Sequence, residues 1–173
     1  MPTDTTLANQ IVFIDGSLQN IDEILAGLAP GVSMVVLDSA QDGLTQTAAA
    51  LAGITDLAAI HIISHGSVGA LQLGSAIVND DNLAEYQAQL EALGAALSPI
   101  GDLMLYGCDV ALGDVGQGFI ENLAALTGAD VAASTALTGS ALLGGDWTLE
   151  ASTGSIETQS IAIDGYAAAL ATI

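Results

Sequence analysis

Two residue types that together can perform covalent chemistry follow apolar stretches of this sequence. His65 follows the stretch 59–64, and Cys108, the only cysteine, follows the stretch 102–107. If these stretches are neighbouring parallel strands, roughly 4.8 Å apart, the imidazole and the thiol project from the same edge of one sheet. The spacing therefore predicts a cysteine nucleophile with a histidine that takes its proton.

The residues beside this pair favour the same chemistry. Gly66 and Gly107 lack side chains and would let a substrate backbone come close. The N–H groups of Gly66 and Cys108 are natural donors to the oxyanion that forms when a thiolate attacks a carbonyl. A helix beginning after Asp114 would point its positive end toward this edge, so we expect it to lower the pKa of the thiol. The neighbouring Asp109 would raise that pKa.

Short β-type runs alternate with segments of helical period, which predicts an α/β fold with a mostly parallel sheet and helices on both faces. A small hairpin around Gly74-Ser75 and a closing antiparallel C-terminal hairpin are also expected. We place the domain at residues 1–159 and treat 160–173 as a tail, either an edge strand or the start of a linker. The expected strands are 11–15, 32–38, 59–65, 102–108, 130–135, 147–150 and 155–157, and the expected helices span about 21–28, 42–51, 80–97 and 119–126.

Two of these stretches resemble motifs of the caspase, gingipain, clostripain and separase superfamily. "HIISHGS" is similar to its His-Gly motif and "LMLYGCD" to its Cys motif. More narrowly, "IVFID", "VVLD", "IHIISHGSVGALQLG", "LMLYGCDVALG" and "LLGGDWTLE" resemble an uncharacterised caspase-like domain near the N-termini of giant bacterial surface proteins. Those proteins carry cadherin-like and calcium-binding repeats and leave the cell by type I secretion. The resemblance implies a three-layer, flavodoxin-like sandwich.

The resemblance also implies where the specificity pocket lies. In the superfamily, the loop after the first strand and the segment after the fifth strand line this pocket; here those places hold Asp15 and Gly145-Asp146-Trp147. Without arginine the pocket cannot accept aspartate as caspases do. Acidic walls would suit Arg or Lys before the scissile bond, and a small neutral residue is the alternative. The chain contains neither Lys nor Arg, so a cut after a basic residue would have to fall elsewhere.

Each candidate residue also has a purely structural interpretation. Cys108 could be a small buried hydrophobic residue. Asp15 could end a strand and stabilise a turn, and Trp147 could belong to the core. His61 lies within a strand, where we expect a structural role. On a strand it is roughly 13 Å from His65, too far for both to bind one zinc ion with Cys108.

Charge limits the classes of partner. The chain has 20 acidic residues, no Lys or Arg, two His and a net charge of −20. Such a chain repels nucleic acids and anionic membranes. No apolar run approaches the ~20 residues that span a bilayer, and no signal peptide is visible. We expect no required cofactor, although calcium would suit this surface.

The leading functional hypothesis combines the pair with its setting. It is a cysteine endopeptidase or self-processing domain, catalysed by His65, Cys108 and the Gly66 amide. Its substrate would be another polypeptide or a downstream domain of its parent. That parent would be a larger surface or extracellular protein, exported by a signal outside this chain. The alternative is an inactive binding or structural module of the same fold, serving adhesion or secretion.

Overall fold

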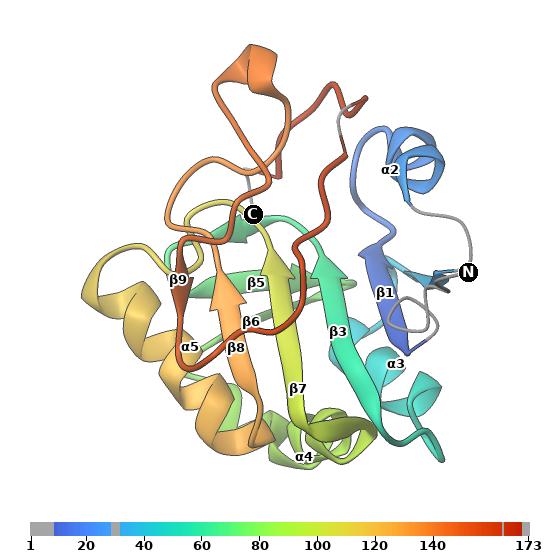
Figure 1. The fold of residues 1–173 in the computed structure, drawn as a ribbon, viewed down its shortest axis with the longest axis vertical. Coiled ribbons are helices and arrows are strands. Elements are labelled where there is room, and N and C mark those ends of the chain that lie inside the picture. The colour runs from blue at the N-terminus through green and yellow to red at the C-terminus, as the bar shows by residue number, and fades with distance from the viewer. Residues whose placement is uncertain (1–8, 29–31, 164, 171–173) are drawn as a thin grey trace.

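The centre of the molecule is a six-stranded sheet in which β9 alone runs antiparallel to its neighbour, within the part of the chain that the structure describes. This computed structural model describes residues 9–28, 32–163 and 165–170. The strand order is β2-β1-β3-β7-β8-β9 (Figure 1). The strands are β1 (Gln10–Asp15), β2 (Ser33–Leu37), β3 (Leu57–Ile63), β7 (Leu97–Tyr106), β8 (Asp130–Ala133) and β9 (Ala151–Ser152).

Helices and a second, smaller sheet complete the fold, which is the predicted α/β architecture. The small sheet is antiparallel, in the order β4-β5-β6, and its β5–β6 hairpin turns at Gly74-Ser75, as predicted. Its strands are β4 (Gly66–Ser67), β5 (Ala70–Leu73) and β6 (Ala76–Asn79). The α-helices are α2 (Ile21–Gly27), α3 (Gly43–Ala50), α4 (Gln87–Ala96) and α5 (Gly113–Thr127), and the short 3-10 helices are η1 (Leu83–Tyr86) and η2 (Ala141–Leu143).

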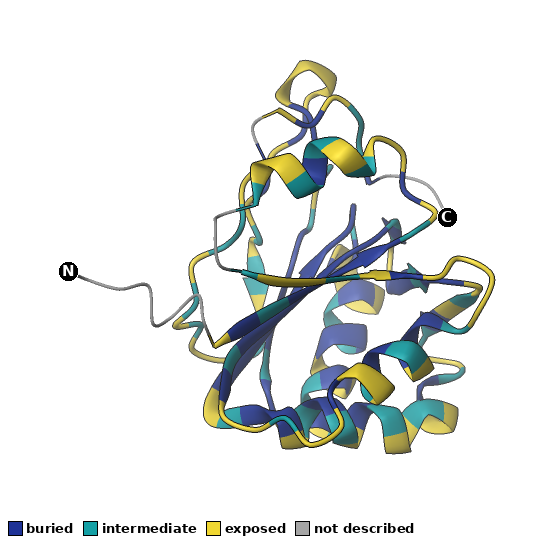
Figure 2. Cartoon of the chain, turned by 90° about the vertical axis from the view of Figure 1, so that its right-hand side faces the viewer, coloured by how far each residue is buried: buried dark blue, intermediate teal, exposed yellow. Residues whose placement is uncertain are grey.

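The central strands are apolar on both faces because both faces are covered. Along β3, Ile60 and Ile62 join one buried cluster while Ile63 joins another, and Leu105 and Tyr106 of β7 divide in the same way. The helices α3, α4 and α5 pack side by side and cover the first face. The helix α2 and extended chain from the C-terminal part of the sequence cover the second, so the sheet lies between two layers (Figure 2).

Local sequence explains how the helices begin and end. The Asp42 carboxylate accepts hydrogen bonds from the amides of Leu44 and Thr45, which fixes the start of α3. The helix α5 buries Phe119, Ile120 and Leu123 along one stripe, and it ends at Gly128, whose φ of 76° favours glycine.

Two predicted elements differ from the structure. The closing hairpin of 147–150 with 155–157 is wrong, because β9 instead forms an antiparallel edge of the main sheet against β8. The helix expected from about residue 80 begins with the 3-10 turn η1, since Asn79 and Asn82 hold a polar turn ahead of it.

The predicted boundary near residue 159 also changes. Residues 153–163 cross the second face of the sheet (Figure 1). Ile163, Tyr166 and Leu170 are buried in the same cluster as strand residues. The described part of 160–170 is therefore neither an edge strand nor a linker: it packs against the sheet, and the domain includes Leu170.

Candidate active site

The ends of β3 and β7 bring His65 and Cys108 to one edge of the sheet, as predicted. In the register of these parallel strands Ile63 is opposite Tyr106. His65 and Cys108 each follow two residues later, so both leave the sheet at the same level. The sequence-predicted pair therefore lies on adjacent connections, beyond the carboxyl ends of neighbouring strands.

Glycine is required where these two connections meet. A Cβ atom on Gly66 would lie 2.7 Å from the side chain of Val110 and 2.9 Å from the carbonyl carbon of Gly107. A Cβ atom on Gly107 would lie 3.1 Å from the Cα atom of Gly66. The close approach brings the amides of Gly66 and Cys108 together.

Both predicted oxyanion donors bind the same carbonyl oxygen. The Gly66 N–H donates to the carbonyl of Leu170 at 3.0 Å, and the Cys108 N–H donates to it at 3.1 Å. These lengths match those of a pair of donors arranged around a reacting carbonyl. The site thus holds a peptide carbonyl in the position predicted for the oxyanion.

The segment 168–170 is held by backbone pairing with residues 138–140. The Ser140 N–H donates to the carbonyl of Ala168, and the Leu170 N–H donates to that of Thr138, both at 2.9 Å. Between them, Gly139 is opposite Ala169 in an antiparallel bridge. The Gly139 φ of 136° and the 2.6 Å between its missing Cβ and the Ala168 carbonyl both require glycine.

The Cys108 thiol is covered and lies against Thr138. Its side chain is 1% exposed; Sγ accepts from the Thr138 N–H at 3.0 Å and donates to the Thr138 carbonyl at 3.4 Å. Burial raises the pKa of the thiol, and the charge of Asp109 raises it further, against backbone hydrogen bonds with Thr138 and Leu170. The predicted lowering by the α5 N-terminus is therefore wrong, because loss of water dominates.

The backbone of His65 is fixed more firmly than its ring. Its carbonyl accepts from the Gln72 N–H at 3.0 Å and from the Ser64 hydroxyl at 3.2 Å. The ring atom Nδ1 is buried, and no described residue forms a hydrogen bond with it. Burial lowers the pKa of His65, and the negative charge of Asp15 opposes this shift. Among the described residues no hydrogen bond joins His65 to Cys108.

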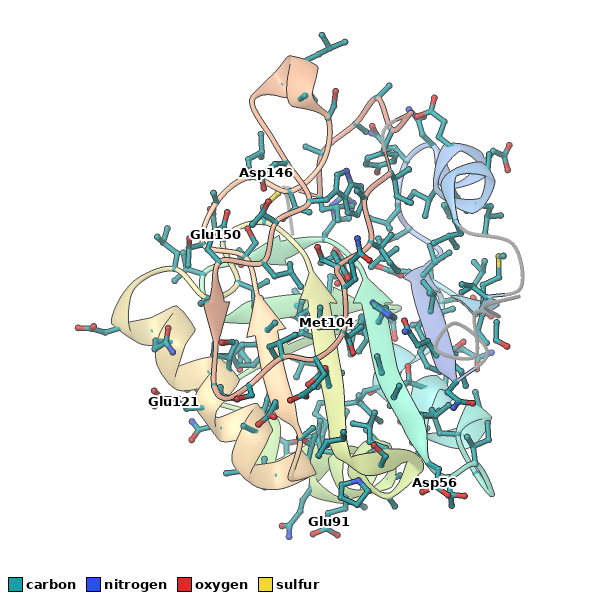
Figure 3. All side chains as sticks on the ribbon, viewed as in Figure 1. Asp56, Glu91, Met104, Glu121, Asp146 and Glu150 are labelled. Carbon is teal, nitrogen blue, oxygen red and sulfur yellow. The ribbon has the colours of Figure 1, made fainter. Side chains whose placement is uncertain are left out.

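The structure does not assemble an acidic pocket from Asp15 and Asp146. Asp15 is fully buried, and its carboxylate accepts from the Ser17 hydroxyl at 2.8 Å and from the Gly74 N–H at 3.2 Å. Asp146 is exposed beyond the tips of the sheet, where its carboxylate accepts from the Thr148 N–H (Figure 3). Its backbone pairs with Leu137 and Gly139 and so supports the stretch that holds residues 168–170.

Trp147 lies in an apolar aromatic group beside the site. It is 8% exposed, and its ring centroid is 6.0 Å from that of Tyr106 and 5.9 Å from that of Tyr166. Leu170 belongs to the same buried cluster. Trp147 thus belongs to the core and also lies near the segment 168–170.

His61 belongs to a structural hydrogen-bond chain away from Cys108. The Ile161 N–H donates to the Tyr106 hydroxyl at 2.9 Å, that hydroxyl donates to Nδ1 of His61 at 3.0 Å, and Nε2–H donates to Gln10 at 2.6 Å. Full burial lowers the pKa of His61 to about 4, so the ring is neutral. This arrangement fits the predicted structural role.

One cluster of three acidic residues could hold a cation, far from the thiol. Oxygen atoms of Asp102, Asp130 and Glu157 lie within 4.8 Å of one another. Asp102 begins the register with β8 and precedes the end of β7 at Tyr106 by four strand positions, roughly 13 Å, and Cys108 lies beyond that end. A cavity of about 680 Å³ also lies at this opposite end, lined by residues 157–162 and the first residues of β1. Neither feature adjoins the thiol.

Sequence reasoning missed the residues that contact the bound segment. Thr138, Gly139 and Ser140 act through their backbone, and Leu170 is held mainly by its own backbone and by burial. Backbone contacts depend little on residue type, so no sequence motif predicts them. The one local signal is the apolar "YAAAL" at 166–170.

A comparison with known families assigns the chain but not its activity. A family model described as a domain of unknown function (DUF4347) matches residues 11–170. The chain belongs to the DUF4347 family. The match ends at Leu170, so the DUF4347 domain includes the segment bound at the predicted oxyanion site. No curated protein and no solved structure matches the chain. Within the described part of this DUF4347 domain, no helix has the length and apolar character needed to cross a bilayer.

Proposed function

We propose that this domain is a cysteine endopeptidase with His65 and Cys108 as its catalytic pair. One observation carries the proposal: two backbone N–H groups, one of them that of Cys108 itself, donate to a single peptide carbonyl. A pair of fixed donors on a peptide carbonyl is the arrangement that stabilises the oxyanion in acyl transfer.

The expected reaction begins with transfer of the thiol proton to His65. The pKa of this histidine is lowered, so its ring is neutral near pH 7 and can accept the proton, while the pKa of Cys108 is raised and the thiol needs a base. The buried charge of Asp15 then stabilises the imidazolium. The thiolate attacks the carbonyl carbon, and the Gly66 and Cys108 amides hold the resulting oxyanion.

The proposed substrate is an extended polypeptide. Residues 138–140 bind their present partner through antiparallel backbone hydrogen bonds, a mode that accepts many sequences. The resemblance to domains of giant surface proteins supports a role in a larger secreted or cell-surface protein, acting on another polypeptide or on a downstream domain of that protein. The proposed reaction requires no cofactor. Calcium would stabilise the domain at Asp102, Asp130 and Glu157 without entering the chemistry.

The alternative is an inactive binding or structural module for adhesion or secretion. The observation that favours it is the covered thiol, which is 1% exposed and shares no hydrogen bond with His65. In that case the backbone of 138–140 would be an ordinary internal pairing.

Replacing Gly66 tests the proposal at its central feature. Gly66→Ala forces its new Cβ against Val110 and Gly107 and separates the two donors, so peptide cleavage should fall by about 100-fold or more. Gly118→Ala is the matched control, because its Cβ would meet nothing nearer than 4.0 Å and should leave cleavage unchanged.

The assay would use a mixed peptide library at neutral pH, with Cys108→Ala defining the background. Product identity is read by mass spectrometry, and folding of each variant by circular dichroism. Equal cleavage by the native protein and Cys108→Ala, in folded samples, would favour the inactive module. Failure of iodoacetamide to modify Cys108 would also favour the inactive module.

A further inference from the structure

Leu170 occupies the candidate active site as the residue before a scissile bond would. Its carbonyl receives both predicted oxyanion donors, its N–H donates to Thr138, and its side chain is fully buried. Ala168, two residues earlier, continues the antiparallel pairing through Ser140. The position of the carbonyl is therefore fixed by the amides that the proposed function assigns to catalysis, and the direction of the segment by the backbone that it assigns to substrate binding.

We infer that the Leu170–Ala171 peptide bond is the domain's own cleavage site and that the site prefers leucine before the cut. This inference rests on the proposed function and names its substrate. It replaces the expected acidic pocket with an apolar one. It also removes the obstacle that the chain has no Lys or Arg at which to cut itself.

The surroundings of Leu170 support an apolar preference. The buried cluster that contains it also contains Cys108, Trp147 and Tyr166. Asp146, expected as a pocket residue, is exposed, and the Asp15 carboxylate is already bonded to Ser17 and Gly74. A charged side chain at position 170 would be buried without an assigned partner, which is costly.

The small residues before Leu170 fit the space available. Gly139 has no Cβ, and one added there would lie 2.6 Å from the Ala168 carbonyl and 2.7 Å from the Ala169 Cα atom. The backbone of 168–169 therefore lies directly against that of 138–140. Tyr166 then anchors the start of the segment, edge to face on Trp147, and its hydroxyl donates to the carbonyl of Gln19 at 3.0 Å.

The chemistry is balanced without any added oxidant or reductant. His65 takes the thiol proton, and the Cys108 sulfur bonds to the Leu170 carbonyl carbon. The bond from that carbon to the Ala171 nitrogen breaks, and His65 returns the proton to the departing amine. Water, deprotonated by His65, then hydrolyses the thioester, leaving a Leu170 carboxylate and a free thiol.

The first test follows the mass of the chain itself. The 173-residue protein is incubated at neutral pH and analysed by intact mass spectrometry, alongside Cys108→Ala. We expect the native chain alone to lose the tripeptide Ala171–Ile173. Leu170→Asp should slow this loss by at least about 100-fold, because a carboxylate is then placed in an apolar site. Leu142→Asp is the matched control, since Leu142 is 95% exposed.

A second variant keeps the test decisive if Leu170→Asp does not fold. Ala171→Pro leaves Leu170 in place but makes the leaving nitrogen part of a proline ring and restricts the residue before it. Cleavage at this bond should be blocked while the melting temperature stays close to that of the native protein. Unchanged cleavage after Leu170 in folded Leu170→Asp, or removal of the tripeptide by Cys108→Ala, would overturn the inference.

Peptides added from outside separate failure of this inference from failure of the proposed function. Tyr-Ala-Ala-Ala-Leu-aminocoumarin and its Arg-ending analogue are compared, and we expect hydrolysis of the leucine peptide alone. Hydrolysis of the leucine peptide without loss of the tripeptide would overturn self-cleavage and keep the peptidase. Hydrolysis of the arginine peptide alone would overturn the leucine preference. No hydrolysis of either, with an intact chain and an unreactive Cys108, would reject the peptidase and this inference together.

Discussion

The two faces of the central sheet are built in different ways. One is covered by α3, α4 and α5, and its cluster is made largely of aliphatic side chains together with the two phenylalanines of the chain, Phe13 and Phe119. The other is covered by α2 and extended chain, and it contains Cys108, Tyr106, Trp147 and the buried His61. Titratable and nucleophilic groups therefore gather under the face that helices cover least.

The difference follows from what each cover does with its backbone. A helix satisfies its own N–H and C=O groups and offers only side chains to the sheet. The extended cover must find partners: the Ile161 N–H donates to Tyr106, and the N–H groups of Glu157 and Thr158 donate to Asp102. Polar strand residues on this face are thus partners for a backbone, and the same kind of pairing holds residues 168–170 at the thiol.

If chemistry is confined to the second face, removal of the His65 ring should affect the rate far more than the fold. His65→Ala should lower the rate of cleavage by about 1,000-fold, as loss of a general acid–base group does. Its melting temperature should change little, because the ring atom Nδ1 forms no hydrogen bond within the described part of the chain. His61→Gln should do the opposite, with stability lowered and cleavage retained. An equal loss of cleavage rate in His65→Ala and His61→Gln would contradict the separation of a catalytic His65 from a structural His61.

Substitutions in the helix-covered face should change the stability of the domain without changing the reactivity of Cys108. Phe119 is fully buried there, so Phe119→Ala should lower the free energy of unfolding by about 3–5 kcal/mol. Urea titration would measure this change. Iodoacetamide modification of Cys108, compared at temperatures where both proteins are folded, should not differ. A large increase in modification would show that the two faces are coupled.

Acid should weaken the second face through His61. Its folded pKa of about 4 lies below the ordinary value of 6.5, so the unfolded chain binds a proton that the folded chain excludes. Stability from this residue is present above pH 6.5 and is lost as pH falls toward 4, by about 3 kcal/mol. Urea titrations of the native protein and His61→Gln across this range would isolate the effect from that of the carboxylates. Parallel pH curves for the two proteins would contradict it.

The smallest expected effect lies at the start of α3, outside both the site and its cover. Asp42→Ala removes acceptors for the Leu44 and Thr45 amides and for the Tyr86 hydroxyl. It should lower the free energy of unfolding by about 1–2 kcal/mol without altering cleavage. Asp114→Ala is the matched control, because Asp114 lies in the first turn of α5 but is not its cap. An equal loss in the two variants would contradict the capping contribution.

The parts predicted from sequence are those fixed by local pattern. The apolar runs of β1, β3 and β7, each followed by a polar or small residue, locate the sheet and bring His65 and Cys108 to one edge. The failed hairpin shows the limit, because β9 pairs with β8, some twenty positions earlier in the chain, as the register of Ala151 with Ala133 records. Local alternation does not identify a distant partner.

The sequence predicted the residues of the candidate site but not the segment that occupies it. His65, Gly66 and Cys108 follow from strand ends and from a motif, which are local features. The expected acidic pocket failed because Asp15 turns inward to Ser17 and Gly74, which sequence spacing does not indicate. The occupant, Leu170, follows Cys108 by more than sixty residues and is bound through backbone atoms, which every residue type shares.

A tethered occupant also determines how many times the site can be used. A segment joined to its own site has an effective concentration in the millimolar range, so a free peptide must compete with a partner that never diffuses away. The leucine left by cleavage keeps the antiparallel pairing of residues 168–170 with 138–140 that is recorded in the uncut chain. A domain of this kind would cut its own chain first, and it would cleave other polypeptides only as fast as its own C-terminal leucine leaves the site.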